Sequence, residues 1–445
     1  MTISLNKEQQ SALEVFNSGH NVFLTGRAGT GKSFLLEYFI GEARKSGKRV
    51  VVTAFTGIAA QNINGATLNS TFALQPIPQL RLPQDEDIPL LLRNTDIFII
   101  DEISICRIDM FEYVMNTINL ACKKWNRSIQ VIVVGDFFQL PPVITAEELD
   151  DLKAYYHGNI GKGFAFQSRI WTRMGFKFIE LKHVMRQDDV EFVQALDKIR
   201  RGDPRGRTWI KSHSSPRAFK DACSIVPTRK EAAEINRSML EKLDKQTECR
   251  YIMDIHGSVS DDDIRADKEL VLRDGALVMI LVNDTSGRGD YVNGTYGTIV
   301  GLYDDCVDIQ LQDGQVVRLD SYKWLSYGYT QSAIDPEIYE PSGNEYHYEA
   351  HIIGWHSQIP VKLAWAITIH KSQGQTYERI NMDISRSWES GHVYTALSRI
   401  RNSHEMYIHG IINAGNVTAD PEVLAFYDDP SGYKTKIKGP YNCIY

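Results

Sequence analysis

The sequence lacks long apolar runs and closely spaced cysteines, and each absence excludes a class of protein. A membrane-spanning helix needs about 18 consecutive apolar residues, and the apolar stretch around Val278 is only a few residues long, so no span is expected. The six cysteines, at positions 106, 122, 223, 249, 306 and 443, never approach Cys-x-x-Cys spacing. Zinc ribbons, iron–sulfur clusters and a disulfide framework are therefore disfavoured, and a reducing cytoplasm is expected.

The sequence also lacks a strong excess of either charge, with 49 basic against 56 acidic residues and a net charge of −7. This balance argues against a protein that coats DNA non-specifically, but it permits a narrow nucleic-acid channel, because local fields determine such binding. The first ten residues, MTISLNKEQQ, lack the basic-then-apolar pattern of an export signal. We therefore expect no membrane partner and a cytoplasmic, nucleoid-associated location if the source is prokaryotic.

What the sequence does contain is an alternation of apolar strands with helices. Its 445 residues suggest about three structural units. Between 21 and 137 we predict strands at 21–26, 49–55, 96–101 and 130–136, with a helix at 34–44 after the first strand. Continuous apolar strands that alternate with helices favour a parallel sheet covered on both faces. The proline-rich and acidic segment 74–93 is predicted to be a projecting loop.

A second α/β pattern is predicted after this, from a strand within 178–187, a helix at 191–201 and a strand–helix pair at 224–236. From 270 to 319 apolar residues alternate with polar ones, and Asn293-Gly294 and Asp313-Gly314 are hairpin signals. This stretch predicts a small antiparallel barrel or sandwich. Buried-strand character resumes near 362–370 and 405–412, so the barrel is predicted to be an insertion in the second α/β domain.

The clearest chemical signal is GRAGTGKS, from Gly26 to Ser33, which matches the phosphate-binding pattern Gly-x4-Gly-Lys-Ser/Thr between a predicted strand and a predicted helix. Backbone amides in such a loop hold phosphates. Lys32 is expected to reach the β- and γ-phosphates, and the Ser33 hydroxyl to bind Mg²⁺. A chance glycine-rich turn is disfavoured by this context.

A pair of acids follows another apolar strand. Asp101 at its end is expected to hold Mg²⁺, and Glu102 to polarise water for attack on the γ-phosphate. The alternative is a solvated strand end. A P-loop kinase often needs no such base, whereas a nucleotide hydrolase does, so hydrolysis is favoured.

Three polar residues further along the chain are candidates to sense or stabilise the γ-phosphate. Gln139 follows a core strand, at the edge where open α/β sheets place ligands. Arg186 and Arg399 each follow a predicted core element, and arginines from a second domain can neutralise transition-state charge. For any one arginine taken alone, a surface ion pair is the ordinary alternative.

Seven segments together resemble the PIF (petite integration frequency) family of DNA helicases, superfamily-one enzymes that move 5′ to 3′ and are related to RecD. The segments occur in family order: GRAGTGKS, TAFTGIAAQNINGATL, DEIS, GDFFQLPPV, RQDDVEFVQALDKIRRG, AWAITIHKSQGQT and VYTALSR. The resemblance runs from about Leu5 to Arg401. It implies two RecA-like P-loop domains, with a wedge-bearing loop in the first and a small β-barrel inserted in the second.

The resemblance also implies roles for individual residues. Gln9 matches the adenine-reading glutamine, Gln139 the γ-phosphate sensor, and Arg186 and Arg399 the two arginine fingers. The nucleotide-contacting positions are Gly29, Thr30, Gly31, Lys32, Ser33 and Gly374. Positions that match strand-contacting residues are Thr56, Gly57, Thr67, Asn69, Thr368, His370 and Lys371. Asn69 stands where the family usually has a histidine, so it can hydrogen-bond DNA but cannot stack on a base.

The implied domains are 1–73 with 94–180 for the first motor domain, 74–93 for the wedge, 181–269 with 361–415 for the second motor domain, 270–360 for the barrel, and 416–445 for a tail of unassigned role. The implied activity is ATP- and Mg²⁺-dependent unwinding of DNA by a monomer that moves on single strands, in repair, recombination, replication or telomere maintenance. Duplexes, G-quadruplexes and RNA–DNA hybrids stay open as preferred substrates. Alternatives are a DNA-stimulated translocase with little unwinding, favoured by the acidic wedge loop, and a nucleotide-gated strand-binding protein.

Overall fold

A computed structural model describes residues 5–55, 60, 63, 65–74, 78–184, 189–220, 222–259, 264–284, 286, 288–291, 293–333 and 346–437. Contacts divide the chain into two compact units, one formed by 1–220 with 369–445 and the other by 221–368. These units do not test the bounds of the predicted domains, which remain a prediction.

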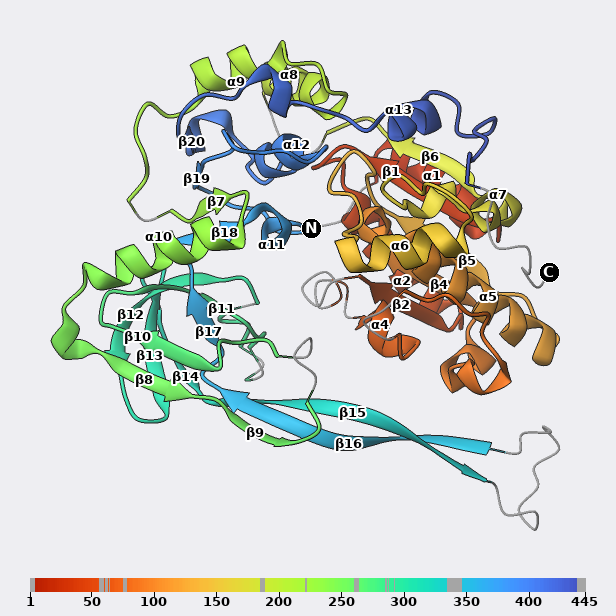
Figure 1. Ribbon diagram of the computed structural model, residues 1–445, viewed down its shortest axis with the longest axis horizontal. Helices are drawn as coiled ribbons and strands as arrows, with labels where there is room; N and C mark the ends of the chain where they lie inside the picture. The colour runs from red at the N-terminus through yellow and green to blue at the C-terminus, as the bar shows by residue number, and fades with distance from the viewer. Residues whose placement is uncertain are drawn as a thin grey trace. The chain divides into compact units, whose positions relative to one another are not determined.

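A six-stranded parallel sheet forms the centre of the first unit (Figure 1), with the strand order β3-β2-β4-β5-β1-β6. The strands are β1 (Val22–Gly26), β2 (Val50–Ala54), β3 (Ala66–Thr67), β4 (Ile97–Asp101), β5 (Gln130–Val134) and β6 (Lys177–Leu181). The four strands predicted between 21 and 137 are confirmed as β1, β2, β4 and β5. The strand predicted within 178–187, as part of the second α/β pattern, instead pairs with β1 and extends the first sheet as β6.

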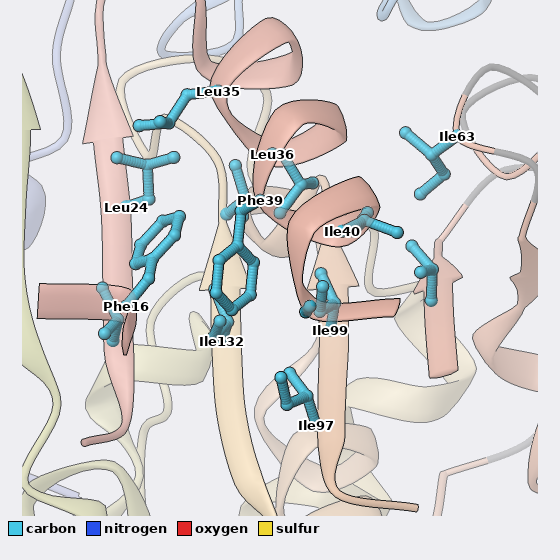
Figure 2. Packing of buried hydrophobic residues seen from close by; sticks show 14 of the residues in the cluster. Phe16, Leu24, Leu35, Leu36, Phe39, Ile40, Ile63, Ile97, Ile99 and Ile132 are labelled. Carbon is cyan, nitrogen blue, oxygen red and sulfur yellow. The ribbon is translucent and has the colours of Figure 1, made fainter. Parts of the chain in front are cut away.

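Helix α2 (Lys32–Lys45) covers one face of this sheet. Its apolar residues Leu35, Leu36, Phe39 and Ile40 recur at helical spacing and point toward strand residues such as Ile132 (Figure 2). The cluster is buried, and Phe39 packs edge-on against Phe16 of α1 (Lys7–Asn17) at 4.9 Å between ring centroids. Since buried apolar area dominates folding energy, this packing fixes the start of α2, and with it the end of the phosphate loop.

Further helices complete the first unit, and the helix predicted at 191–201 is confirmed as α8. They are α4 (Leu68–Thr71), α5 (Ile108–Lys124), α6 (Ala146–Tyr155), α7 (Arg169–Met174), α8 (Val190–Arg200), α9 (Gly206–His213), α11 (Ile369–Ser372), α12 (His392–Leu397) and α13 (Pro421–Asp428). Two short parallel strands, β19 (Ile380–Met382) and β20 (Met406–Ile408), also belong to this unit. The tail is thus partly helical, and Phe426 of α13 stacks on Phe166 at 4.4 Å.

The described part of the wedge segment, 78–93, has no α-helix or strand, as predicted, but it does not project freely. It contains a 3₁₀ turn at Asp85–Asp87 and begins another at Leu90–Asn94. Arg81 makes a bidentate ion pair with Asp87, at 2.6 and 2.7 Å, and Lys124 of α5 lies 3.1 Å from Asp85. The acidic run is therefore partly neutralised by its own surroundings.

The second unit contains a parallel pair, β7 (Ser224–Val226) and β18 (Ala366–Thr368), which packs against α10 (Arg229–Glu241). Its largest sheet is antiparallel, in the order β14-β13-β12-β11-β17. These strands are β11 (Leu277–Ile280), β12 (Tyr296–Leu302), β13 (Cys306–Leu311), β14 (Val316–Asp320) and β17 (Val361–Leu363). Val307, Ile309 and Leu311 are buried on one face of β13, as the alternation predicted. Closure of the sheet into a barrel stays a prediction.

The two hairpin signals lie in connections of different lengths. Asp313-Gly314 lies in the turn between β13 and β14, with Gly314 at a φ of 89°, and confirms the prediction. Asn293-Gly294 also lies between paired antiparallel strands, β11 and β12, but at the end of a long connection, where the Gly294 amide donates to the Ile280 carbonyl. Strands β11 and β12 pair in the register that places Leu277 opposite Thr298 and Met279 opposite Tyr296.

Two long strands, β15 (Tyr322–Ala333) and β16 (Tyr346–Gln358), form an antiparallel ribbon in the second unit (Figure 1). Strand β9 (Asp254–Gly257) extends the base of this ribbon, and β8 (Cys249–Ile252) pairs with β10 (Glu269–Leu272) beside it. This ribbon was not anticipated from the sequence.

A buried glutamate in α5 predicts a pH-dependent stability. Burial raises the pKa of Glu112 from 4.5 to about 7, although Ser168 and Tyr156 both donate hydrogen bonds to it. A raised folded-state pKa means that the stabilisation is complete below 4.5 and is lost as the pH rises through about 7. The loss is on the order of 3 kcal/mol.

Glu112→Gln is neutral at every pH and should remove this component. Chemical unfolding at pH 5 and at pH 8 measures it: the wild type should lose more free energy of unfolding over this interval than the variant does. Equal losses would show that Glu112 does not titrate in this interval.

Candidate nucleotide-binding and hydrolysis site

The phosphate loop connects β1 to α2 in the conformation that its glycines permit. Gly29 and Gly31 both have a φ of 81°, in the left-handed region that favours glycine. The Lys32 ammonium donates to the carbonyls of Gly26, at 2.7 Å, and Arg27, at 3.1 Å, and so lies across the loop. Burial lowers the pKa of Lys32, and the acids around it, Asp136 foremost, partly offset that effect. The loop has the backbone and the cation that a polyphosphate requires.

The predicted acid pair lies at the end of β4. Glu102 has a φ of 53°, which is uncommon for a residue other than glycine, and its amide donates to Asp101 Oδ1 at 2.8 Å. Burial, then the charge of Glu102, raises the pKa of Asp101 to about 7. A divalent cation beside these two carboxylates would relieve that repulsion, so the pair suits a hard metal ion.

Glu102 is also fixed from a distant part of the chain. Gln373, which follows α11, donates from Nε2 to Glu102 Oε2 at 3.1 Å. A Cβ placed on Gly374 would lie 3.7 Å from Glu102 Oε1. The structure therefore brings Gly374 beside the acid pair. It also adds Gln373 to the site, a residue of the HKSQG segment that was not predicted to have a role.

Gln139 and Arg399 come together as well. Arg399, which follows α12, is buried, and its Nη2 lies 3.4 Å from Gln139 Oε1 and 2.8 Å from Ser398 Oγ. Its Nε donates to the Thr395 carbonyl at 2.9 Å. Burial lowers the pKa of Arg399, and the charge of Glu102 is the largest opposing influence. The surface ion-pair alternative is therefore wrong for this arginine. Arg186 lies outside the described residues.

A buried network of polar side chains contacts the phosphate loop. None of these contacts was predicted from the sequence. Asp136 pairs with Arg200 of α8 at 2.9 Å, and both side chains are almost fully buried. Tyr394 of α12 donates to Asp136 Oδ2 at 3.1 Å and accepts the amide of Ala28 in the phosphate loop at 3.1 Å. The network thus ties the loop to the strand end that leads to Gln139.

The tail contributes to this network. The hydroxyl of Tyr427 in α13 lies 2.6 Å from Thr25 Oγ1 in β1 and accepts the Phe137 amide at 3.3 Å. The only sequence signal available was the apolar and aromatic composition of 423–427, which does not identify a partner. The described part of the tail, 416–437, is therefore joined to the first unit through buried contacts.

Gln9 occupies a capping position. Its side chain accepts the Asn6 amide at 3.1 Å, and Asn6 Oδ1 accepts the Gln9 amide at 2.8 Å, a capping box at the start of α1. Gln9 is fully buried. Its assigned reading of adenine remains a prediction.

The candidate strand-contacting residues fall into separate places. Thr67 caps α4, where its hydroxyl accepts the Ser70 amide at 3.1 Å, and Asn69 is exposed on the same helix. His370 and Lys371 are exposed on α11 of the first unit, whereas Thr368 is buried in β18 of the second. Thr56 and Gly57 lie outside the described residues.

In the part of the chain that the structure describes, no group of three or more histidine, cysteine, aspartate or glutamate residues is placed to hold a metal ion. Within the same residues, no helix has the length and apolar character needed to cross a bilayer.

Known helicases are similar to this chain along most of its length. The sequence model of the PIF1-like helicase family matches residues 4–205. The chain is 31% identical to the ATP-dependent DNA helicase Pif1 of Bdellovibrio bacteriovorus, over 97% of this chain and 93% of that protein. Bacteroides Pif1 bound to single-stranded DNA matches with a TM-score of 0.72 and 31% identity, over 96% of this chain and 97% of the other. Bacteroides Pif1 in complex with ADP-AlF4 matches with a TM-score of 0.73 and 29% identity, over the same shares.

Proposed function

Because this chain belongs to the PIF1-like helicase family, we propose that the site described above hydrolyses ATP to drive the chain 5′ to 3′ along single-stranded DNA. The protein is an ATP-dependent DNA helicase with two RecA-like domains. The observation that carries the proposal is the convergence of distant segments around the phosphate loop, where Tyr394 accepts the Ala28 amide at 3.1 Å and Arg399 lies 3.4 Å from Gln139.

Each residue in the site has a chemical task in this proposal. Lys32 and the loop amides bind the phosphates, and Ser33 and Asp101 hold Mg²⁺, which would neutralise part of the phosphate charge when bound. Glu102, held by Gln373 at 3.1 Å, orients and polarises the attacking water. Gln139 and Arg399 lie together where they can respond to the γ-phosphate and stabilise the charge that develops on it.

Hydrolysis is favoured over phosphate transfer because the base is fixed in place. The hydrogen bond from Gln373 to Glu102 Oε2 is not expected of a carboxylate at a solvated strand end. Because this bond uses Oε2, we assign the other oxygen, Oε1, to the attacking water. The raised pKa of Asp101 is consistent with a carboxylate that a metal ion normally accompanies.

DNA is the proposed track, and the chain is proposed to act on it as a monomer. Hydroxyl, imidazole and ammonium groups at Thr67, His370 and Lys371 suit phosphate contacts, which position a strand without reading its sequence.

The acidic wedge segment favoured a translocase without unwinding, but Arg81 and Lys124 pair with Asp87 and Asp85. This pairing lowers the repulsion that the segment would exert on DNA and supports strand separation.

Duplexes with a single-stranded tail on one end test the proposal. A 5′-tailed duplex should be unwound in the presence of ATP and Mg²⁺, and a 3′-tailed duplex of the same sequence should not. Omitting Mg²⁺ should stop unwinding. Preference for the 3′ tail would contradict the direction of movement, and unwinding of a blunt duplex at the same rate would contradict tracking along a single strand.

A further inference from the structure

A large aromatic side chain is exposed in the first unit with no assigned role. Trp388, between β19 and α12, has 62% of its surface accessible to solvent. Isolated small apolar residues on a surface need no explanation. An exposed indole is different, because its large flat face is the kind of surface that stacks on a nucleic-acid base.

The indole lies in a chain of rings that leads to the candidate strand-contacting residues. The ring of His392 lies nearly perpendicular to that of Trp388, with 4.9 Å between the centroids. The ring of His392 also lies next to that of His370, with 5.4 Å between the centroids and the two planes again nearly perpendicular. One buried side chain, that of His392, thus separates Trp388 from His370, which is exposed on α11.

His392 supports the indole without adding charge. It is fully buried, and burial, with a contribution from His370, lowers its pKa to about 4. Both of its ring nitrogens lack a hydrogen-bond partner in the structure. At neutral pH it is therefore an uncharged ring wedged between Trp388 and His370, which restricts the position of both.

The charge next to Trp388 in the sequence does not oppose a polyanion. The neighbouring Glu389 would repel phosphate, but Lys162 lies 2.5 Å from its carboxylate and neutralises it. Lys371 is exposed on α11 next to His370. An aromatic side chain together with a nearby cation is a combination with which proteins hold single strands irrespective of sequence, and here the cation is Lys371, the sequence neighbour of His370.

We propose that Trp388 stacks on an unpaired base of the single strand, next to the phosphates that His370 and Lys371 contact. The inference rests on the proposed function, since it assumes that α11 faces the DNA. Stacking on every base face alike would hold the strand without sequence preference.

Binding of two probes to three forms of the intact chain tests this inference. The probes are an oligothymidylate and an oligonucleotide of equal length that carries abasic sites in its interior. Trp388→Ala should bind the oligothymidylate about tenfold more weakly than the wild type. Trp388→Phe, which keeps a smaller ring, should lie between the two. On the abasic probe the wild type and Trp388→Ala should bind with nearly equal affinity, because there is no base to stack.

Tryptophan fluorescence gives a second readout. Oligothymidylate should quench the wild type, and the quench should shrink in Trp388→Phe but persist in the control Trp209→Phe, which removes another of the seven tryptophans. Equal affinity of wild type and Trp388→Ala for oligothymidylate would overturn the inference, as would an equal loss on both probes. A wild-type chain that binds neither probe would instead contradict the proposed function.

Discussion

Replacing Lys32 by alanine is expected to abolish ATP turnover and to leave the affinity for single-stranded DNA within a few-fold of the wild type. The Lys32 ammonium lies across the phosphate loop, on the carbonyls of Gly26 and Arg27, where the β- and γ-phosphates are proposed to bind. Without it, negative charge on the phosphates is no longer compensated from that side. The candidate strand contacts lie on other elements, including α4 and α11.

A matched control is available on the same helix. Lys45, in the last turn of α2, is exposed and pairs with Glu42 at 2.9 Å. Exposed pairs of this kind contribute little, so Lys45→Ala should retain turnover. Steady-state ATP hydrolysis and oligonucleotide anisotropy measure both effects. Loss of DNA binding by Lys32→Ala equal to its loss of turnover would mean that the two sites are not separate.

Replacing Arg399 by alanine should lower DNA-stimulated turnover by about 10³ or more, the scale of an arginine finger, while nucleotide affinity stays within a few-fold. Arg399 is buried beside Gln139, and most nucleotide contacts are proposed to come from the loop and Gln9. Arg399→Lys keeps a charge but lacks the planar fork, so it should recover only part of the rate.

The control for Arg399 is an arginine in the ordinary surface setting. Arg379 is exposed and pairs with Glu405 at 2.8 Å, and Arg379→Ala should have near-normal turnover. Nucleotide titration and steady-state hydrolysis, with and without oligonucleotide, distinguish the two arginines. Near-normal stimulated turnover in Arg399→Ala would show that this guanidinium does not act on the γ-phosphate.

Local patterns predicted the elements whose burial is continuous along the chain. The strands β1, β2, β4 and β5 carry uninterrupted apolar runs, and the phosphate loop lies between one such strand and a helix, where its spacing predicted it. The alternation in β13 likewise reflects one buried face. Each of these signals depends on neighbours in sequence, so it can be read without knowing the tertiary contacts.

The features that were missed depend on pairing between distant residues. Nothing in the sequence around Asp136 indicates that Arg200 and Tyr394 will meet it, and Gln373 is an ordinary polar residue until its contact with Glu102 is known. The partner of β6 could not be read from its own residues, because an apolar strand pairs equally well with either sheet. Asn293-Gly294 did not reveal the length of its connection, since a turn dipeptide also occurs at the end of a longer link between two paired strands.

The central claim is that DNA and ATP hydrolysis are coupled in one motor, and ATP turnover by the unaltered chain with and without single-stranded oligonucleotide tests it most directly. The account predicts slow turnover alone and turnover at least about tenfold faster with saturating oligonucleotide, in line with the large effect of completing a phosphoryl-transfer site. Equal turnover in the two conditions would contradict it.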